Sequence, residues 1–65
     1  MTPTVKYDPE ADAAYVRFSP ERVEESEEVA DGIVLDYDSD GRIVGIEVMD
    51  ARRHLSPELL DKAAA

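Results

Sequence analysis

The chain of 65 residues contains no cysteine, so no disulfide bond can stabilise its fold. A domain this small has a marginal hydrophobic core, and without disulfides it usually gains stability from a metal or a partner subunit. The lack of cysteine also fits a reducing compartment. We therefore expect residues 1–65 to form a single cytoplasmic domain that assembles as a homodimer.

Long apolar runs are lacking as well, since no segment approaches the roughly 20 residues that a membrane-spanning helix needs. The N-terminus does not have the basic and then apolar layout of a signal peptide. Basic residues are few: 7 lysines and arginines against 16 acidic residues leave a net charge of −9. This charge repels nucleic-acid phosphates and anionic lipid headgroups but speeds association with a basic protein. We expect no nucleic-acid or membrane partner, and the charge favours a basic partner protein.

Alternating apolar and polar residues predict two strands in the first third of the chain, at residues 4–7 and 13–19, separated by a turn at Asp8-Pro9. In the second strand Ala14, Val16 and Phe18 share one face, which we assign to the core. Residues 21–31 carry six carboxylates and little apolar surface. This stretch is predicted to be either a mobile loop or an edge strand, where charge discourages aggregation.

The strongest structural signal is a β-hairpin at residues 32–49, where two β-branched runs flank Asp38-Ser39-Asp40-Gly41. Asp40-Gly41 suits a two-residue type I′ turn, which needs positive φ at both positions. The resulting pairs place six apolar residues on one face: Tyr37 with Val44, Leu35 with Ile46, and Ile33 with Val48. A three-residue loop would mix the two faces, so side-chain parity favours the two-residue turn.

Ser56, Pro57 and Glu58 are typical of the start of a helix, as N-cap, first helical residue and first-turn acid. A helix is therefore predicted at about residues 56–63, beyond a sheet that spans about residues 4–49. The expected fold class is α+β: a small antiparallel β-meander of about four strands with a short C-terminal helix packed on one face.

One motif indicates metal chemistry. Asp36, Asp38, Asp40, Gly41 and Glu47 have the spacing of a 12-residue EF-hand calcium loop. The hairpin explains the same residues, however, and an EF-hand needs flanking helices where this sequence predicts strands. We expect no bound cofactor, and calcium binding by the segment from Asp36 to Glu47 is the alternative hypothesis.

Catalysis is not expected. A cysteine–histidine pair cannot form, and a serine–histidine–carboxylate triad needs a pocket that 65 residues can hardly build. Solvated carboxylates on loops also lack the burial that raises the pKa of a catalytic acid. Four residues are instead predicted on the outward face of the sheet, where a contiguous patch would mark a protein interface and the contact of a homodimer: Tyr15, Val34, Ile43 and Met49.

Four segments occur in a familiar order: residues 6–13 (KYDPEADA), 25–29 (ESEEV), 32–38 (GIVLDYD) and 41–48 (GRIVGIEV). In these segments the chain resembles the small prokaryotic family catalogued as domain of unknown function 2283. The resemblance implies a β-rich single-domain protein. Because members are often encoded near other small genes, it also implies an antitoxin-like or partner-binding role. The leading hypothesis is therefore a non-enzymatic protein-interaction module, and calcium addition should raise thermal stability only if the alternative holds.

Overall fold

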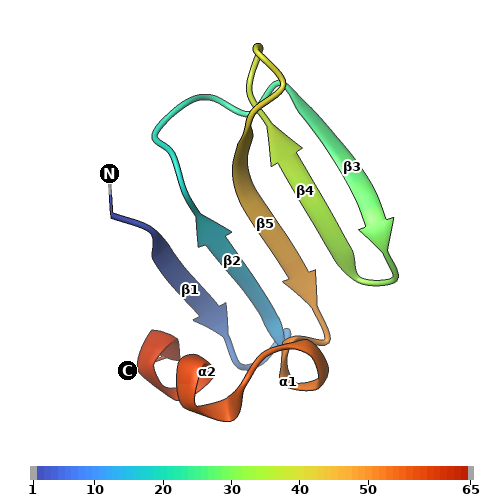
Figure 1. Cartoon of the computed structure of the whole chain (residues 1–65). Coiled ribbons are helices and arrows are strands. Elements are labelled where there is room, and N and C mark those ends of the chain that lie inside the picture. Colours follow the sequence, from blue (N-terminus) through green and yellow to red (C-terminus); the bar gives the residue numbers. More distant parts are fainter. Residues whose placement is uncertain (1, 65) are drawn as a thin grey trace.

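The structure, a computed structural model, describes residues 2–64. Within that range the chain forms one five-stranded antiparallel sheet with two short helices at one end, as Figure 1 shows. The elements in chain order are β1 (Thr4–Asp8), β2 (Ala13–Arg17), β3 (Glu25–Ala30), β4 (Ile33–Tyr37), β5 (Ile43–Met49), α1 (Ala51–His54) and α2 (Pro57–Ala64). The predicted α+β class is confirmed.

The sheet has one strand more than the four predicted. This strand is β3, which lies in the acidic stretch and pairs only with β4. Of the two alternatives for this stretch, the edge strand is confirmed. The strands lie in the order β1-β2-β5-β4-β3. The predicted meander is therefore wrong in its order: the chain crosses from β2, an inner strand, to β3 at the edge, and β5 later returns to pair with β2.

The β4–β5 hairpin has the predicted register along most of its length, with Ile33 opposite Val48 and Leu35 opposite Ile46. The predicted two-residue turn is wrong. The amide of Asp38 donates to the carbonyl of Arg42 at 2.9 Å, which closes a three-residue loop, and among the loop residues only Gly41 has positive φ, at 79°. Such loops are a type I turn followed by one left-handed residue.

A β-bulge reconciles this loop with the register. Tyr37 pairs with Ile43 while Asp36 pairs with Gly45, so Val44 is an extra residue in β5. One extra residue offsets the one-residue difference in loop length. The predicted pairs therefore hold between the bulge and the open end of the hairpin. Nearer the loop, Tyr37 pairs with Ile43 and not with Val44 as predicted.

The helices cover one face of the sheet, which carries Tyr7, Ala14 and Val48 and is called the helix face here; the opposite face is the open face. The buried core of that face consists of Ala14, Val48, Ala51 and Leu60. The helices lie at one end of the sheet, with α2 packed chiefly on β1 (Figure 1). Neither helix among the described residues has the length and apolar content to cross a membrane.

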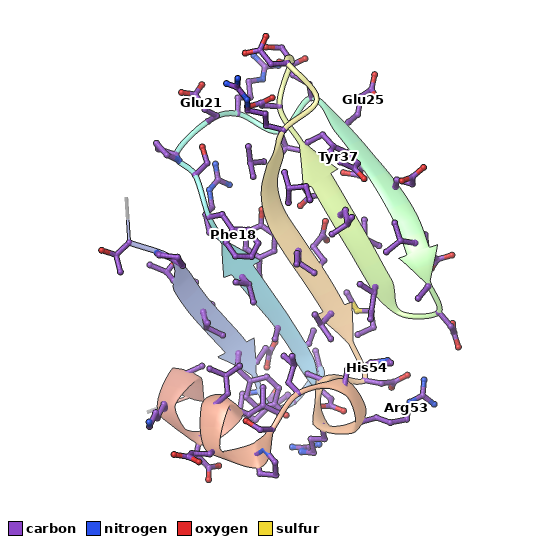
Figure 2. All side chains as sticks on the ribbon, in the orientation of Figure 1. Phe18, Glu21, Glu25, Tyr37, Arg53 and His54 are labelled. Carbon is purple, nitrogen blue, oxygen red and sulfur yellow. The ribbon has the colours of Figure 1, made fainter. Side chains whose placement is uncertain are left out.

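The C-terminal helix begins as predicted, because the hydroxyl of Ser56 accepts a hydrogen bond from the amide of Leu59 at 3.2 Å. The preceding helix α1 was not predicted. Phe18 is another correction: it was assigned to the core, but it is 40% exposed and lies away from the helices (Figure 2). The helices are too short to reach that end of the sheet.

Candidate functional site

The centre of the open face carries a group of polar side chains from four adjacent strands. This open-face cluster consists of Tyr15 on β2, Ser26 on β3, Asp36 on β4 and Glu47 on β5. The register brings them together, since Tyr15 lies opposite Glu47 and Ser26 lies opposite Asp36. Directly paired residues on neighbouring strands point to the same face, so the four side chains converge.

Asp36 is the central residue of the cluster, and it is only 2% exposed. The hydroxyl of Ser26 donates a hydrogen bond to Oδ1 of Asp36 at 2.6 Å. A carboxylate this deeply buried costs free energy unless hydrogen bonds satisfy it. The edge strand β3 therefore has a direct function in the site: it supplies the hydroxyl that holds Asp36 in place.

Gly45 makes room for the phenol ring of Tyr15. A Cβ atom built on Gly45 would overlap the hydroxyl and ring carbons of Tyr15, so the ring lies against the β5 backbone. Gly45 is also the residue opposite Asp36. A glycine inside a strand often marks such a close approach. Without a side chain at this position, Tyr15 can reach across β5 toward the Asp36 carboxylate.

The electrostatics of the cluster reflect two carboxyl groups held close together in a partly desolvated place. A hydrogen bond to Asp36 raises the pKa of the Glu47 carboxyl, and burial and the negative charge of Asp36 raise it further. The pKa of Tyr15 is raised by burial first and then by the charge of Asp36. The raised pKa favours the protonated form of Glu47 beside Asp36.

Three residues of the cluster, Tyr15, Asp36 and Glu47, line a hollow of about 550 Å³ on the open face. Its rim is part charged and part apolar, and the residues that line it besides the cluster include Lys6, Asp8, Ala13 and Met49. The hollow is open to solvent and large enough to receive a side chain of a bound protein.

The four residues predicted to bind calcium do not converge. Asp36 and Glu47 meet in the open-face cluster, but Asp38 and Asp40 lie in the hairpin loop, where Oδ1 of Asp38 accepts hydrogen bonds from the amides of Asp40 at 2.9 Å and Arg42 at 3.0 Å. Within residues 2–64 no three histidine, cysteine, aspartate or glutamate side chains are placed to hold a metal ion. Strands rather than helices flank the loop, so the EF-hand cage is not formed.

The four residues predicted to form an interface do not make one continuous patch. Tyr15 and Val34 lie on the open face but on either side of Glu47. Met49 lies at the rim of the hollow and is 45% exposed. Ile43 is opposite Tyr37 beyond the bulge, and its position in the register puts it on the helix face.

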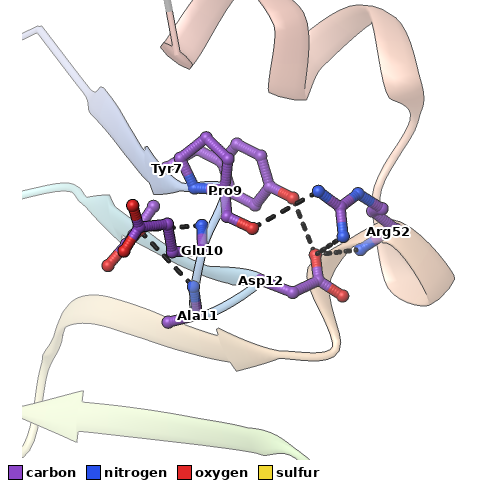
Figure 3. A network of polar contacts seen from close by, with 7 residues as sticks. Tyr7, Pro9, Glu10, Ala11, Asp12 and Arg52 are labelled. Carbon is purple, nitrogen blue, oxygen red and sulfur yellow. Dashed lines mark hydrogen bonds and ion pairs between the residues drawn. The ribbon is translucent and has the colours of Figure 1, made fainter.

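A second polar network joins α1 to the turn between β1 and β2 (Figure 3). Oδ1 of Asp12 accepts hydrogen bonds from the Tyr7 hydroxyl at 2.7 Å and the Arg52 amide at 3.1 Å, and it forms an ion pair with Arg52 Nη1 at 3.8 Å. The Arg52 guanidinium also donates to the carbonyl of Pro9 at 3.3 Å. This network fixes the helices on the sheet, so we assign it a structural role.

The roles of Ser26, Gly45 and the Asp12 network are not predicted by the sequence. Gly45 was the available signal, because a glycine inside a β-branched run indicates a bulge or a close approach. Asp36 was a second signal, since it is a lone acid within an apolar strand. Asp12 and Arg52 are 40 residues apart in sequence, and only the folded sheet brings them together.

Comparison with known proteins agrees with the resemblance found in the sequence. The family model described as "Protein of unknown function (DUF2283)" matches residues 4–52, which include the whole sheet, the open-face cluster and Arg52. Searches of curated proteins and of solved structures found no significant match. Because the family model covers about three quarters of the 65 residues, the chain belongs to the DUF2283 family of proteins of unknown function.

Proposed function

We propose that this protein is a non-enzymatic protein-interaction module, antitoxin-like in that it binds a basic partner protein on its open face. The observation that carries the proposal is the placement of Asp36, 2% exposed, beside Glu47 in the lining of a hollow in the middle of a sheet face. The net charge of −9 supports the same partner chemistry, because it attracts a basic protein over a distance.

The cluster favours a cation for a physical reason. A carboxylate pair with little solvent around it attracts a lysine or arginine side chain more strongly than solvated acids do. The phenol of Tyr15 adds an aromatic surface on which a guanidinium can stack. A bound cation favours the ionised form of Glu47, so binding should release a proton, and affinity should rise as the pH rises through the raised pKa of Glu47.

The arrangement fits binding better than catalysis. The hydroxyl of Ser26, which could otherwise act as a nucleophile, donates its hydrogen bond to the buried Asp36 carboxylate. The histidine of the chain, His54, lies on α1 at the end of the sheet (Figure 2). These positions support a role for the pair of acids in compensating a positive charge rather than in activating a nucleophile.

Affinity capture from the native host, followed by calorimetry with the purified captured protein, tests the proposal. We expect a basic partner whose affinity falls with salt and falls about tenfold or more with Glu47→Gln, as for a charge pair in an interface. The matched control is Glu58→Gln on α2, which makes the same change in charge at an exposed position remote from the cluster. Equal effects of the two variants, or a partner that is not basic, would contradict the proposal.

A further inference from the structure

The helices leave part of the helix face uncovered. Across the row nearest the helices, Ala14 and Val48 are buried. One row further, Val16, Ile46 and Leu35 lie side by side on β2, β5 and β4 and are only half-buried. Beyond this row Val44 on β5 is fully buried, so exposure does not rise evenly along the face.

Two large apolar side chains at the end of this face remote from the helices are exposed. Phe18 is 40% exposed and Ile43 is 47% exposed. Tyr37, opposite Ile43, is half-buried and donates its hydroxyl to Glu27 at 3.2 Å. We call these apolar and aromatic residues together the distal apolar surface: Val16, Phe18, Leu35, Tyr37, Ile43 and Ile46.

The molecule is also less compact than a self-sufficient monomer of its size. Its accessible surface is 4538 Å², whereas a monomer of 7.2 kDa is expected to expose about 4,100 Å². Its radius of gyration is 11.8 Å, against about 10.8 Å expected for 65 residues. The extents of 33 × 27 × 16 Å describe a flat slab. A second layer on the uncovered part of the sheet would remove this excess surface.

We propose that this second layer is another copy of the chain, packed face to face through the distal apolar surface of each subunit. A two-fold axis brings the same apolar residues of both copies together, so the contact is self-complementary. Sheets pack in this way at about 10 Å separation. At the β3 edge, Glu25, Glu27 and Glu28 would face the same acids of the second copy. Glu25 and Glu27 also border the distal apolar surface, since they pair with Tyr37 and Leu35, and their charges add to the repulsion between the two copies.

The association is expected to be weak. If the contact removes no more than the excess of about 400 Å² per chain, it buries about 800 Å² in the pair, below the roughly 1,200–2,000 Å² of stable interfaces. The net charge of −9 on each chain adds repulsion. The dimer should therefore be weak, grow with concentration, and strengthen with salt that screens the repulsion.

Sedimentation velocity over a wide range of concentration and salt tests the proposal. We expect the wild type to shift from 7.2 kDa toward twice that mass as concentration and salt increase. Phe18→Gln should weaken the association about tenfold or more, as expected for an aromatic residue at the centre of an interface. Ile43→Gln is a second variant on the same surface, at a residue that is 47% exposed and tolerant of a polar side chain.

Met49→Gln is the matched control, since Met49 is 45% exposed and lies at the rim of the hollow on the open face. It should leave the association unchanged. A 7.2 kDa species under all conditions would overturn the proposal. So would a Met49→Gln variant that weakens the association as much as Phe18→Gln and Ile43→Gln do. The partner on the open face is a separate question, because a monomer that still binds a basic protein would contradict this inference alone.

Discussion

At the scale of single residues, the open-face cluster depends on the lack of a side chain at Gly45. Gly45 has no Cβ, and the phenol of Tyr15 occupies that space on its way to Asp36. Asp36 in turn is held by the hydroxyl of Ser26. Three residues that are not acidic, Gly45, Tyr15 and Ser26, therefore hold the two acids of the site in position. They come from three different strands.

The close approach of Tyr15 to Gly45 gives the first prediction. Gly45→Ala should lower the free energy of unfolding by about 1–3 kcal/mol, because the added methyl group forces the ring of Tyr15 aside. The measurement is urea denaturation. In a Tyr15→Ser background the same substitution should cost much less, since the obstructing ring is gone. An equal cost in both backgrounds would show that the ring does not lie against Gly45.

The second prediction concerns the hairpin loop, where only Gly41 needs positive φ. Gly41→Ala should destabilise the protein by about 1 kcal/mol through backbone strain alone, because an added Cβ there meets no atom within 4 Å. Asp40→Ala should cost much less, since Asp40 does not have positive φ. A large and equal loss in both variants, measured by thermal denaturation, would favour the two-residue turn instead.

The third prediction concerns the pH dependence of stability. Since the pKa of Glu47 in the folded state is raised above its ordinary value of 4.5, the folded protein binds this proton more tightly than the unfolded chain does. The resulting stabilisation is fully present below 4.5 and is lost as the pH rises through the raised pKa. Compared with the wild type, Glu47→Gln should therefore gain stability as the pH increases. Urea denaturation at a series of pH values measures the difference, and parallel curves for the two proteins would contradict the raised pKa.

At the scale of elements, the sequence predicts most of the strands because successive side chains of a strand point to opposite faces of the sheet, which gives an alternation of apolar and polar residues. The hairpin at residues 32–49 has the predicted pairs at Ile33 and Leu35 for this reason. Side-chain parity does not predict the length of the loop, because parity fixes the loop only when both strands are regular. The bulge at Val44 breaks that regularity. A bulge requires one extra residue and leaves no mark in an alternating pattern.

The edge strand and the helices show a second limit of the sequence. Capping residues predict α2 because Ser56 acts locally on its own helix. The start of α1 depends instead on Asp12, which lies in the turn between β1 and β2. Its carbonyl accepts a hydrogen bond from the amide of Ala51 at 2.9 Å. In β3, the polar Ser26 acquires its role only from Asp36 on the neighbouring strand. Contacts between elements, rather than local preferences, are what the sequence alone could not provide.

The hairpin also gives the fourth prediction, which concerns calcium. Asp38 is engaged with backbone amides in the loop, while Asp36 and Glu47 lie in the cluster, so the four carboxyl groups do not form one cage. We expect no calcium dissociation constant tighter than about a millimolar, the weak end for carboxylate sites. Calorimetric titration checks this. Micromolar binding that disappears in Glu47→Gln would establish the calcium alternative.

At the scale of the whole molecule, the two faces of the sheet are chemically different. The open face has a buried carboxylate in the lining of a hollow, and the helix face has an uncovered apolar end. Alternation along residues 43–49 predicts an apolar interface on the open face, because it assigns Ile43 and Met49 to the same side. The bulge separates these two residues, and Glu47 interrupts the remaining apolar side chains.

The two proposals use these two faces for different partners. A basic protein would bind the acidic open face, and a second copy would cover the apolar end of the helix face. Both can occur in one assembly, since the surfaces do not overlap. The acids of β3 discourage association through that edge of the sheet.

The central claim is that the open-face cluster binds a basic partner, and mapping of amide chemical shifts tests it most directly. The isotopically labelled protein is titrated with the captured partner, and shift changes are compared between the two faces. The proposal predicts that the largest changes occur at Tyr15, Asp36 and Glu47, with smaller changes at Phe18 and Leu35. Largest changes at Phe18 and Leu35, or no changes on the open face at saturation, would contradict it.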